Sequence, residues 1–428
     1  MNFNHFFSTT LKEDKSKAAL ICDQKIYTYG ELDAQIEIEK KRLSKLPPHT
    51  INCEYIENSF STLSSFLAHL KLNLIWAPFY KRTQSHSSDL LINSLQGKCI
   101  PKHSGILFRT SGSTGKSKLI LNEESDLIAN AEIAIKGQKL TCDSRCYTSL
   151  TFAHVGGLKM QAIPTLLCGG TIIWDRRFQP QRVIQKLNEA THSVLVPAQL
   201  RKLVIHKEWE DFILQNNHTL ITGSMPVSYD LINSLKAKNI QVQVVYGLTE
   251  IGPYALCDTE NPSLPKDALG CLGRPIPPYK ASIRWEDKDP HKGELLLEGP
   301  SMGKQITIQE NSVTVKSPSN INTGDLVTKI EESYFFLGRI GRRLNIGGYK
   351  YSPEEIEEFL RGHLAIKEAY IKKEFINNDE IAHLYIDTTL SKGEVKRIIH
   401  RHFSIYKVPN KITISDTIEK TDIEKPRS

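Results

Sequence analysis

Most of the chain alternates between short apolar runs and longer stretches with apolar residues at helical spacing. The first helix is predicted to begin at a capping box, Thr-Tyr-Gly-Glu at residues 28–31, and to end near residue 46, before two prolines. Its apolar residues lie among Glu and Lys, so the helix buries one face. Residues 59–72 predict a second helix, and an apolar run over residues 73–79 follows it.

From residue 125 onward, strand and helix patterns alternate. Helices are predicted near residues 125–136, near residues 180–189 and from residue 198, and strands at residues 170–174, 193–197 and 219–222. This βαβ rhythm favours a mostly parallel sheet covered by helices. The sequence Thr-Gly-Ser-Met-Pro at residues 222–226 follows a strand, where sheets of this kind bind their ligands.

The pattern after residue 340 is that of a small α/β domain. Helices are predicted over residues 353–361 and 391–403, and strands over residues 368–373 and 382–387. We therefore expect an α/β protein with a large N-terminal domain, residues 1–340, and a small C-terminal domain, residues 341–428. The large domain is expected to include a small β subdomain around residues 293–300.

Composition and charge narrow the function classes. Hydrophobic residues make up 39% of the chain and charged residues 24%, as in an ordinary globular protein. The net charge of +7 favours anionic ligands such as nucleotides and carboxylates. No basic stripe combines with aromatic residues, so nucleic acid is not an expected partner. The longest uncharged stretch, residues 160–174, is short and contains Pro164 and two glycines, so no membrane span is expected.

The cysteines and the N-terminal residues indicate the cellular compartment of the protein. The eight cysteines include no Cys-x-x-Cys pair, and Cys142 and Cys146 have no second pair or clustered histidine to complete a zinc site. The first residues, Met-Asn-Phe-Asn-His-Phe-Phe, do not have the basic start and apolar core of a signal peptide. We therefore expect reduced thiols in a cytoplasmic protein.

A loop of small residues between two apolar runs carries the strongest chemical signal. The pattern predicts strand–loop–strand, and backbone N–H groups, hydroxyls and lysines in such a loop can wrap a polyphosphate. A Walker A loop is excluded, because that motif needs a glycine five positions before Gly115 and the residue there is Thr110. A flexible Ser/Gly hairpin is the alternative. The candidate phosphate-binding residues are Thr110, Ser111, Gly112, Ser113, Thr114, Gly115, Lys116 and Lys118.

A second signal follows the apolar run Val-Gln-Val-Val at residues 242–245. The run ends in Tyr246, Gly247, Thr249 and Glu250, which together can stack on a base, touch a phosphate and hold a magnesium ion. Mg²⁺ prefers a carboxylate and phosphate oxygens over a cage made only of protein. Taken alone, the same residues could begin a helix.

The ordered set of motifs resembles the adenylate-forming superfamily, which includes acyl- and aryl-CoA synthetases, peptide-synthetase adenylation domains and luciferases. Residues 110–118 resemble its phosphate loop, although Ser117 replaces the usual proline. Residues 222–226 resemble its turn beside the adenine, which brings in Gly223 and Ser224. Residues 339–357 resemble its hinge motif, and the resemblance implies a small C-terminal domain that moves.

The resemblance also implies ATP and Mg²⁺ and a role for each motif residue. Tyr246 is expected to stack on adenine, Thr249 to contact the α-phosphate and Glu250 to bind the metal. Asp325 is expected at the ribose hydroxyls and Arg339 at the ribose or a phosphate. In the same way, His154 borders the acyl pocket and Lys425 is catalytic.

By this resemblance, the expected activity is ATP-dependent adenylation of a small carboxylic acid, followed by thioester formation with coenzyme A. Phe152, Ala153 and His154 offer no carboxylate for a substrate α-amine, which disfavours an amino acid. The small acyl- or aryl-CoA ligases fit best, with the o-succinylbenzoate–CoA ligases as a specific candidate group.

Two alternatives stay open. One is a stand-alone adenylating enzyme that loads an acyl carrier protein. The other is a nucleotide-binding protein that has lost catalysis, because the chain has Gly341 at the usual hinge Asp, Asn345 at a usual lysine and Glu424 at a usual glycine.

Overall fold

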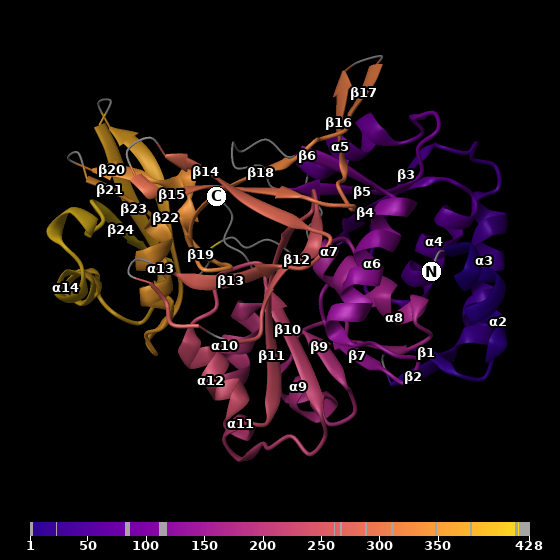
Figure 1. Cartoon of the computed structure of the whole chain (residues 1–428), viewed down its shortest axis with the longest axis horizontal. Helices are drawn as coiled ribbons and strands as arrows, with labels where there is room; N and C mark the ends of the chain where they lie inside the picture. Colours follow the sequence, from indigo (N-terminus) through magenta and orange to yellow (C-terminus); the bar gives the residue numbers. More distant parts are fainter. Residues whose placement is uncertain are drawn as a thin grey trace.

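The structure is a computed structural model of the chain. It describes residues 3–22, 24–81, 86–110, 118–260, 262–265, 268–286, 289–309, 312–346, 349–376, 379–415 and 418. Two sheets and the helices around them form the larger part, and a separate sheet with two helices forms the C-terminal part, at the left of Figure 1.

A 13-stranded sheet runs through the larger part, in the order β14-β15-β18-β19-β13-β12-β11-β10-β9-β7-β8-β1-β2. Neighbours from β1 through β11 in this order are parallel, and from β11 to β14 they are antiparallel. The strands are β1 (Ala18–Cys22), β2 (Lys25–Thr28), β7 (Arg145–Thr148), β8 (Thr171–Trp174), β9 (His192–Val194), β10 (His218–Gly223), β11 (Ile240–Leu248), β12 (Gly252–Asp258), β13 (Gly270–Pro275), β14 (Lys280–Glu286), β15 (Asp289–Glu298), β18 (Ile321–Ile330) and β19 (Ser333–Arg339).

Helices cover both faces of the parallel part (Figure 1). Successive residues of a strand point to opposite faces. On β8, Ile172 and Trp174 pack in one core with α3 (Tyr29–Leu43), α4 (Phe60–Lys71), α6 (Glu124–Gln138) and α8 (Ile163–Leu167), whereas Ile173 packs in a second core with α9 (Pro180–Leu187), α10 (Pro197–Val204), α11 (Lys207–Asp211) and α12 (Tyr229–Lys236). The short segments α1 (Phe3–His5), η1 (Phe6–Thr10) and α2 (Leu11–Glu13) add to the first core. Strand β8, which has three apolar residues after Thr171, is therefore buried on both sides, as βαβ architecture requires.

A six-stranded sheet carries the predicted phosphate loop. Its order is β17-β16-β6-β5-β4-β3, with strands β3 (Ile51–Ile56), β4 (Ile75–Tyr80), β5 (Gly105–Thr110), β6 (Lys118–Glu123), β16 (Lys304–Gln309) and β17 (Ser312–Lys316), and α5 (His86–Leu95) precedes β5. Strands β5 and β6 are antiparallel, and Thr110 pairs with Lys118 across the loop. The two predicted strands are confirmed, and residues 111–117 between them lie outside the described residues. The β16–β17 hairpin extends this sheet away from the body, at the top of Figure 1.

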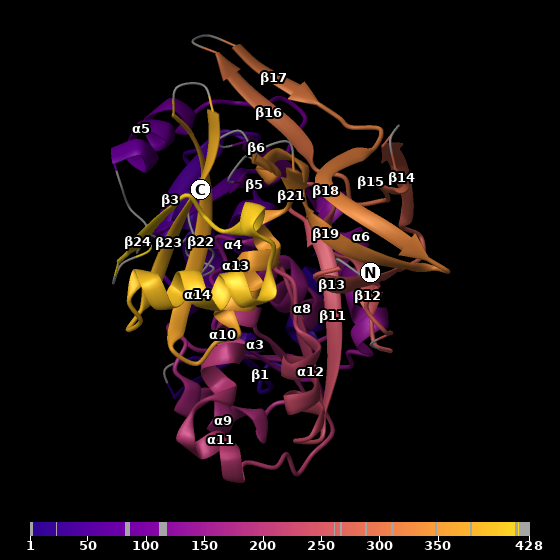
Figure 2. The same cartoon turned by 90° about the vertical axis from the view of Figure 1, so that its left-hand side faces the viewer.

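The C-terminal part has its own hydrophobic core, built only from residues after residue 343. It comprises β20 (Leu344–Ile346), β21 (Tyr349–Tyr351), the sheet of β22 (Ile366–Ile376), β23 (Asp379–Thr388) and β24 (Lys411–Ile414), and helices α13 (Pro353–Arg361) and α14 (Lys392–His402), with short turns η4 (Ile340–Arg342) and η5 (Ile405–Lys407). Figure 2 shows α14 lying along this sheet. The separate core supports the boundary predicted at residue 341, which remains a prediction.

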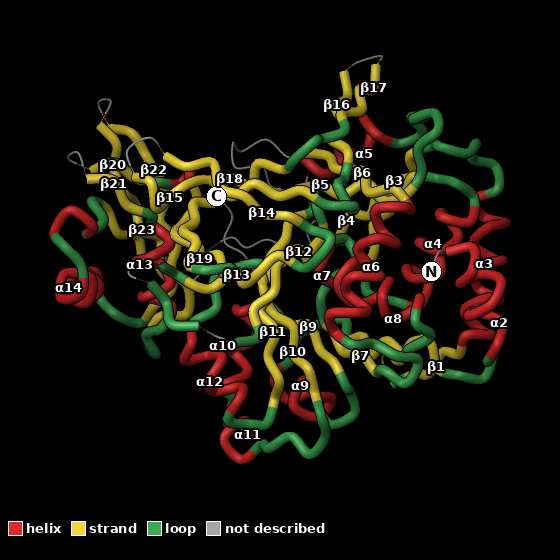
Figure 3. Tube along the Cα trace, in the orientation of Figure 1, coloured by secondary structure: helices red, strands yellow, loops and turns green. Residues whose placement is uncertain are grey.

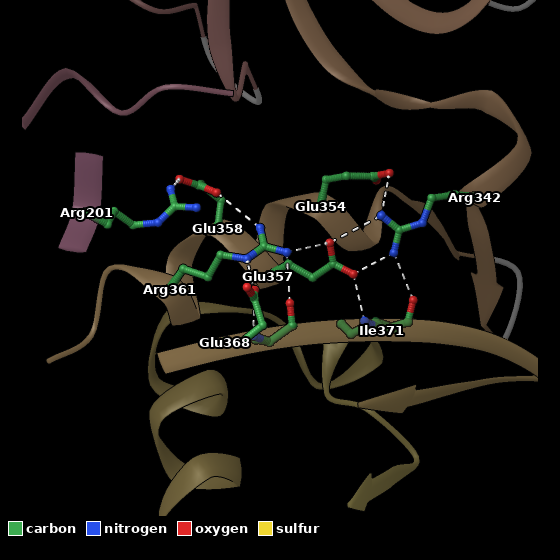
Figure 4. A network of polar contacts seen from close by, with 9 residues as sticks. Arg201, Arg342, Glu354, Glu357, Glu358, Arg361, Glu368 and Ile371 are labelled. Atoms are coloured by element: carbon green, nitrogen blue, oxygen red, sulfur yellow. Dashed lines mark hydrogen bonds and ion pairs between the residues drawn. The ribbon is translucent and has the colours of Figure 1, made fainter. Parts of the chain in front are cut away.

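Acidic residues on α13 join the C-terminal part to the larger part. Glu354, Glu357 and Glu358 lie within one helical turn, so their like charges would repel without cations between them. Arg342 and Arg361 contact Glu357 at 2.5 and 3.4 Å, and Arg201 of α10 contacts Glu358 at 3.1 Å (Figure 4). The last contact is an ion pair between the two parts.

The predicted α/β class is confirmed, and the predicted helices match the structure closely. The capping box of Thr28 and Glu31 begins α3, and α13 has the predicted bounds. The run over residues 73–79 corresponds to β4, and residues 293–300 overlap β15. The strand predicted over residues 193–197 is shifted, because Pro197 is the first residue of α10. Figure 3 shows strands grouped in the centre with helices on both sides.

Two compositional expectations can be compared with the described residues. Within them, no helix is long and apolar enough to cross a membrane. All eight cysteines lie in the described part of the chain, and none forms a disulfide.

Candidate active site

Three predicted site residues meet at the junction of β11, β18 and β19. The Tyr246 hydroxyl donates a hydrogen bond to Asp325 Oδ2 at 2.6 Å, and Arg339 Nε lies 3.0 Å from Asp325 Oδ1. Asp325 and Arg339 are cross-strand partners, which fixes the ion pair. Burial, and next the charge of Asp325, raise the pKa of the Tyr246 hydroxyl well above its ordinary value, so this hydroxyl stays protonated and donates.

Asp325 keeps one acceptor position open. Its side chain is buried, and Oδ1 has no partner in hydrogen-bond geometry among the described residues, although Arg339 is near. Thr222 Oγ1, at the end of β10, is also buried without a hydrogen-bond partner in the described part of the chain. Buried polar atoms are normally paired, so unpaired ones mark a place for a polar ligand. Ribose hydroxyls are donors that fit such an acceptor.

Two glycines at the carboxyl ends of β10 and β11 let neighbouring segments of the backbone approach closely. A Cβ on Gly223 would lie 2.1 Å from the Val245 carbonyl oxygen, and one on Gly247 would lie 2.0 Å from the Gly252 carbonyl oxygen. Ser224 follows in the left-handed region, with φ of +72°. The carboxyl ends of the parallel strands β10 and β11 therefore form a tight, ordered edge, which is the ligand-binding edge of such sheets.

The predicted metal residue lies in a turn after β11. Asn122 Nδ2 donates to the Thr249 carbonyl oxygen at 3.4 Å, and the Gly303 N–H donates to the Glu250 carbonyl oxygen at 2.7 Å. These bonds hold the backbone and leave the Glu250 carboxylate available, since it has no ion pair with another described residue. The alternative that residues 246–250 begin a helix is excluded, because they form the end of a strand and a turn.

A buried lysine contacts this turn through Asn122. Lys159 donates a hydrogen bond to Asn122 Oδ1, and its side chain is fully buried. Burial lowers the pKa of Lys159 to about 8, and the charges of Asp126 and Glu250 oppose this shift. Lys159 and Asn122 thus link the turn at Thr249 and Glu250 to the hydrophobic core.

One carboxylate is a sufficient protein ligand for Mg²⁺ when phosphates supply the others. Within the described residues, no group of three or more His, Cys, Asp or Glu side chains is arranged to hold a metal ion. The donor set therefore fits a magnesium ion that arrives with a nucleotide and does not fit a resident metal cage.

His154 lies in a different place from the Tyr246 cluster. It lines a small open cavity of about 30 Å³ together with Tyr55, Pro78, Phe79, Tyr80, Ser88, Arg109 and Ala153. Thr110 and Lys118 mark the base of the phosphate loop. Ser111, Gly112, Ser113, Thr114, Gly115, Lys116 and Lys425 lie outside the described residues.

The sequence did not single out three further residues near these sites, namely Asn122, Lys159 and Arg109. Thr222 belongs to the stretch over residues 222–226 that the sequence did indicate. Asn122 and Lys159 are 37 residues apart and meet only in the folded chain, so no local pattern marks them.

The middle of the chain matches the model of a known protein family. Residues 99–306 match the family model described as AMP-binding enzyme, and this stretch contains the loop, the glycine turn and the motif from Tyr246 to Glu250. This stretch of the chain is therefore similar to the AMP-binding enzyme family.

Among curated proteins, the chain is similar to CoA ligases. It is 28% identical to an indoleacetate–CoA ligase of Aromatoleum aromaticum over 74% of this chain and 64% of that protein. It is 24% identical to a 2-succinylbenzoate–CoA ligase of Oceanobacillus iheyensis over 81% of this chain and 73% of that protein. The chain spans only 55% of a feruloyl-CoA synthase of Amycolatopsis.

A solved structure shares the whole fold. The o-succinylbenzoate CoA synthetase from Bacillus subtilis, in complex with an acyl-adenylate, has a TM-score of 0.85 at 19% identity, over 99% of this chain and 96% of that one. A structure of the same enzyme with ATP and magnesium ion has a TM-score of 0.82 at 18% identity, over 99% and 98% of the two chains. These likenesses establish the fold.

Proposed function

We propose that the protein activates a carboxylic acid with ATP and passes the acyl group to coenzyme A. A carboxylate oxygen attacks the α-phosphorus, the bond to the bridging oxygen breaks, and pyrophosphate leaves an acyl-AMP. The thiol sulfur then attacks the acyl carbon, and AMP leaves with the acid's oxygen. The observation that carries the proposal is the Tyr246–Asp325–Arg339 cluster around the buried Asp325 carboxylate, whose Oδ1 accepts no hydrogen bond from the described residues. The cluster adjoins the strand edge that carries the glycine turn.

Each part of the nucleotide has a candidate partner. Asp325 accepts hydrogen bonds from the ribose hydroxyls, Tyr246 lies along the adenine, and Arg339 supports Asp325 and faces the ribose or a phosphate. Lys118 at the base of the loop, and Lys425 from the tail, supply positive charge to the phosphates. Glu250 would hold Mg²⁺, which neutralises phosphate charge as pyrophosphate departs. The protein's contribution is positioning and charge stabilisation.

The cavity beside His154 is the proposed acyl site. Aromatic side chains of β3 and β4 line it, so it suits an acid with an apolar or aromatic body. Relatives named for indoleacetate, ferulate and 2-succinylbenzoate act on acids of this kind, and 2-succinylbenzoate is a specific candidate substrate. ATP, coenzyme A and reduced cysteines fit a cytoplasmic location, with no membrane or nucleic-acid partner.

A carrier protein is a second candidate acceptor. The chain is 26% identical to a fatty acid–[acyl-carrier-protein] ligase of Mycobacterium marinum, over 61% of this chain and 53% of that protein. A carrier protein would present a thiol of the same chemistry, attached to a protein partner.

Exchange of labelled pyrophosphate into ATP, measured across a panel of acids, tests the proposal. At least one acid should stimulate exchange, and Asp325→Ala should abolish it while Asp387→Ala, a change in the C-terminal sheet, should not. Adding coenzyme A or a carrier protein then separates the two acceptors. ATP binding without exchange for any acid would instead support a nucleotide-binding protein that has lost catalysis.

A further inference from the structure

The cavity beside His154 contains a cation whose partner is absent from the described residues. The cavity lies at the carboxyl ends of three neighbouring parallel strands, and Tyr55 comes from β3, Phe79 from β4 and Arg109 from β5. Tyr55 pairs with Phe79 across β3 and β4. Ile75 pairs with Gly105 across β4 and β5, and Phe79 and Arg109, each four residues further along, line the same cavity. Paired residues share a face, so these three side chains form one row.

Arg109 lies at the end of a face of the sheet whose other residues on β4 and β5 are apolar. Along the same face of β4 and β5, Ile75, Ala77 and Leu107 are buried in one core with Phe79. Arg109 follows them half-buried, and its guanidinium has no hydrogen bond or ion pair with any described residue. A partly buried guanidinium has five N–H donors to satisfy, so an unpaired one at a cavity wall favours an anionic ligand.

The nearby acidic residue is already engaged. The Tyr55 hydroxyl donates to Asp89 Oδ1 and lies 3.1 Å from Ser88 Oγ, which ties α5 to β3. Asp89 therefore already has a hydrogen-bond partner in Tyr55. The residues that line the cavity include aromatic rings, three hydroxyls and the guanidinium of Arg109.

We propose that Arg109 binds a second anionic group of the acid, so that the preferred substrates carry a carboxylate in addition to the one that reacts. This inference rests on the proposed function, because the cavity is the proposed acyl site. Arg109 acts as a specificity residue and takes no part in bond making. A guanidinium binds a carboxylate in a two-pronged geometry that a lysine cannot reproduce.

Contact with the ATP phosphates is the competing role, since Arg109 adjoins Thr110. The row with Tyr55 and Phe79 favours the cavity, because these residues line the acyl site. The two roles predict different selectivity. A phosphate contact would affect all acids equally, whereas a contact with the acid would affect only those with a second charge.

The test uses hydrolysis-stable acyl-adenylate mimics, in which a sulfamate replaces the phosphate. Pairs of mimics differ only in a terminal carboxylate or carboxamide, on aliphatic and phenyl-containing acyl chains. Binding is measured by titration calorimetry for the wild type, Arg109→Gln, Arg109→Lys and the control Arg177→Gln, which changes an exposed arginine outside the cavity.

For at least one acyl chain, the wild type and Arg177→Gln should bind the carboxylate mimic about 10- to 100-fold more tightly than the carboxamide mimic. Arg109→Gln should reduce this ratio to near one without weakening the carboxamide mimic, and Arg109→Lys should give an intermediate ratio. Equal weakening of both mimics by Arg109→Gln would overturn the inference in favour of a phosphate contact. A wild-type ratio near one for every chain would also overturn it, whether or not the variants fold.

Binding of AMP separates this inference from the proposed function. If the wild type binds AMP and the mimics without a preference for the carboxylate, only the role of Arg109 is wrong. If it binds neither AMP nor any mimic, the proposed adenylation fails, and the inference about Arg109 fails with it.

Discussion

The ion pair between Arg201 and Glu358 should set how often the C-terminal part separates from the rest of the molecule. Replacing Arg201 with Met keeps most of the apolar stem and removes the charge. The pair joins α10 to α13 at 3.1 Å, and its side chains are 23% and 15% exposed (Figure 4). Its loss should therefore favour the separated state and leave each part folded.

The magnitude follows from the partners that remain. Burial lowers the pKa of Arg201 and Glu358 opposes this shift, so the cation depends on this carboxylate. Glu358 retains Arg361 at 3.2 Å and is not left alone. We therefore place the loss just below the range for hydrogen bonds to charged groups, at about 1–1.5 kcal/mol. This is an increase of about fivefold to thirteenfold in the separated population.

Limited trypsin digestion at the junction measures this population, because cleavage tracks the open form when opening is fast. Arg342, Arg343 and Lys350 provide cleavage sites there. Arg201→Met should speed cleavage about fivefold to thirteenfold. Glu355→Gln, which breaks the pair with Lys407 inside the C-terminal part, should not. Equal rates for wild type and Arg201→Met would refute the reasoning and make the contact energetically neutral.

Three further predictions concern the site. Gly223→Ala should destabilise the fold by about 1–3 kcal/mol and weaken AMP binding, because the new Cβ would clash with the Val245 carbonyl oxygen. Denaturant unfolding measures the change in stability, and the control is Gly393→Ala, where no atom lies within 4 Å of the new Cβ. Glu250→Gln should slow pyrophosphate exchange far more than it weakens AMP binding, and equal effects would argue against a metal role. The stability of the wild type relative to Lys159→Met should rise between pH 8 and about 10.5. The pKa of Lys159 in the folded protein, about 8, lies below its ordinary value, so the unfolded chain binds more protons in this pH range. If the difference in denaturant midpoints between the two proteins does not change with pH, the buried cation is contradicted.

Local sequence patterns predicted the positions of most helices and strands. The capping box at Thr28 and the helix over residues 353–361 were predictable because side chain and backbone within a few residues decide them. The alternation of strands and helices likewise predicted the parallel part of the large sheet. The antiparallel extension from β12 to β14 was less evident, since pairing among these strands depends on register between distant segments.

The contacts within the site could not be read from the sequence. Tyr246 and Asp325 are 79 residues apart, and a Gly-Asp pair alone indicates only a turn. Arg109 likewise joins Tyr55 at one cavity only through the registers of β3, β4 and β5. Resemblance supplied the roles of Asp325 and Arg339, and the structure supplies their contact. The roles of Lys425 and the central loop residues remain predictions.

Isotope transfer tests the central claim most directly. The acid that best stimulates exchange is labelled with ¹⁸O in its carboxylate and incubated with ATP and coenzyme A. Because the carboxylate oxygen attacks the α-phosphorus and leaves with AMP, mass spectrometry should find one ¹⁸O in each AMP and none in pyrophosphate. Label in inorganic phosphate, or unlabelled AMP, would contradict adenylation of the acid by this protein.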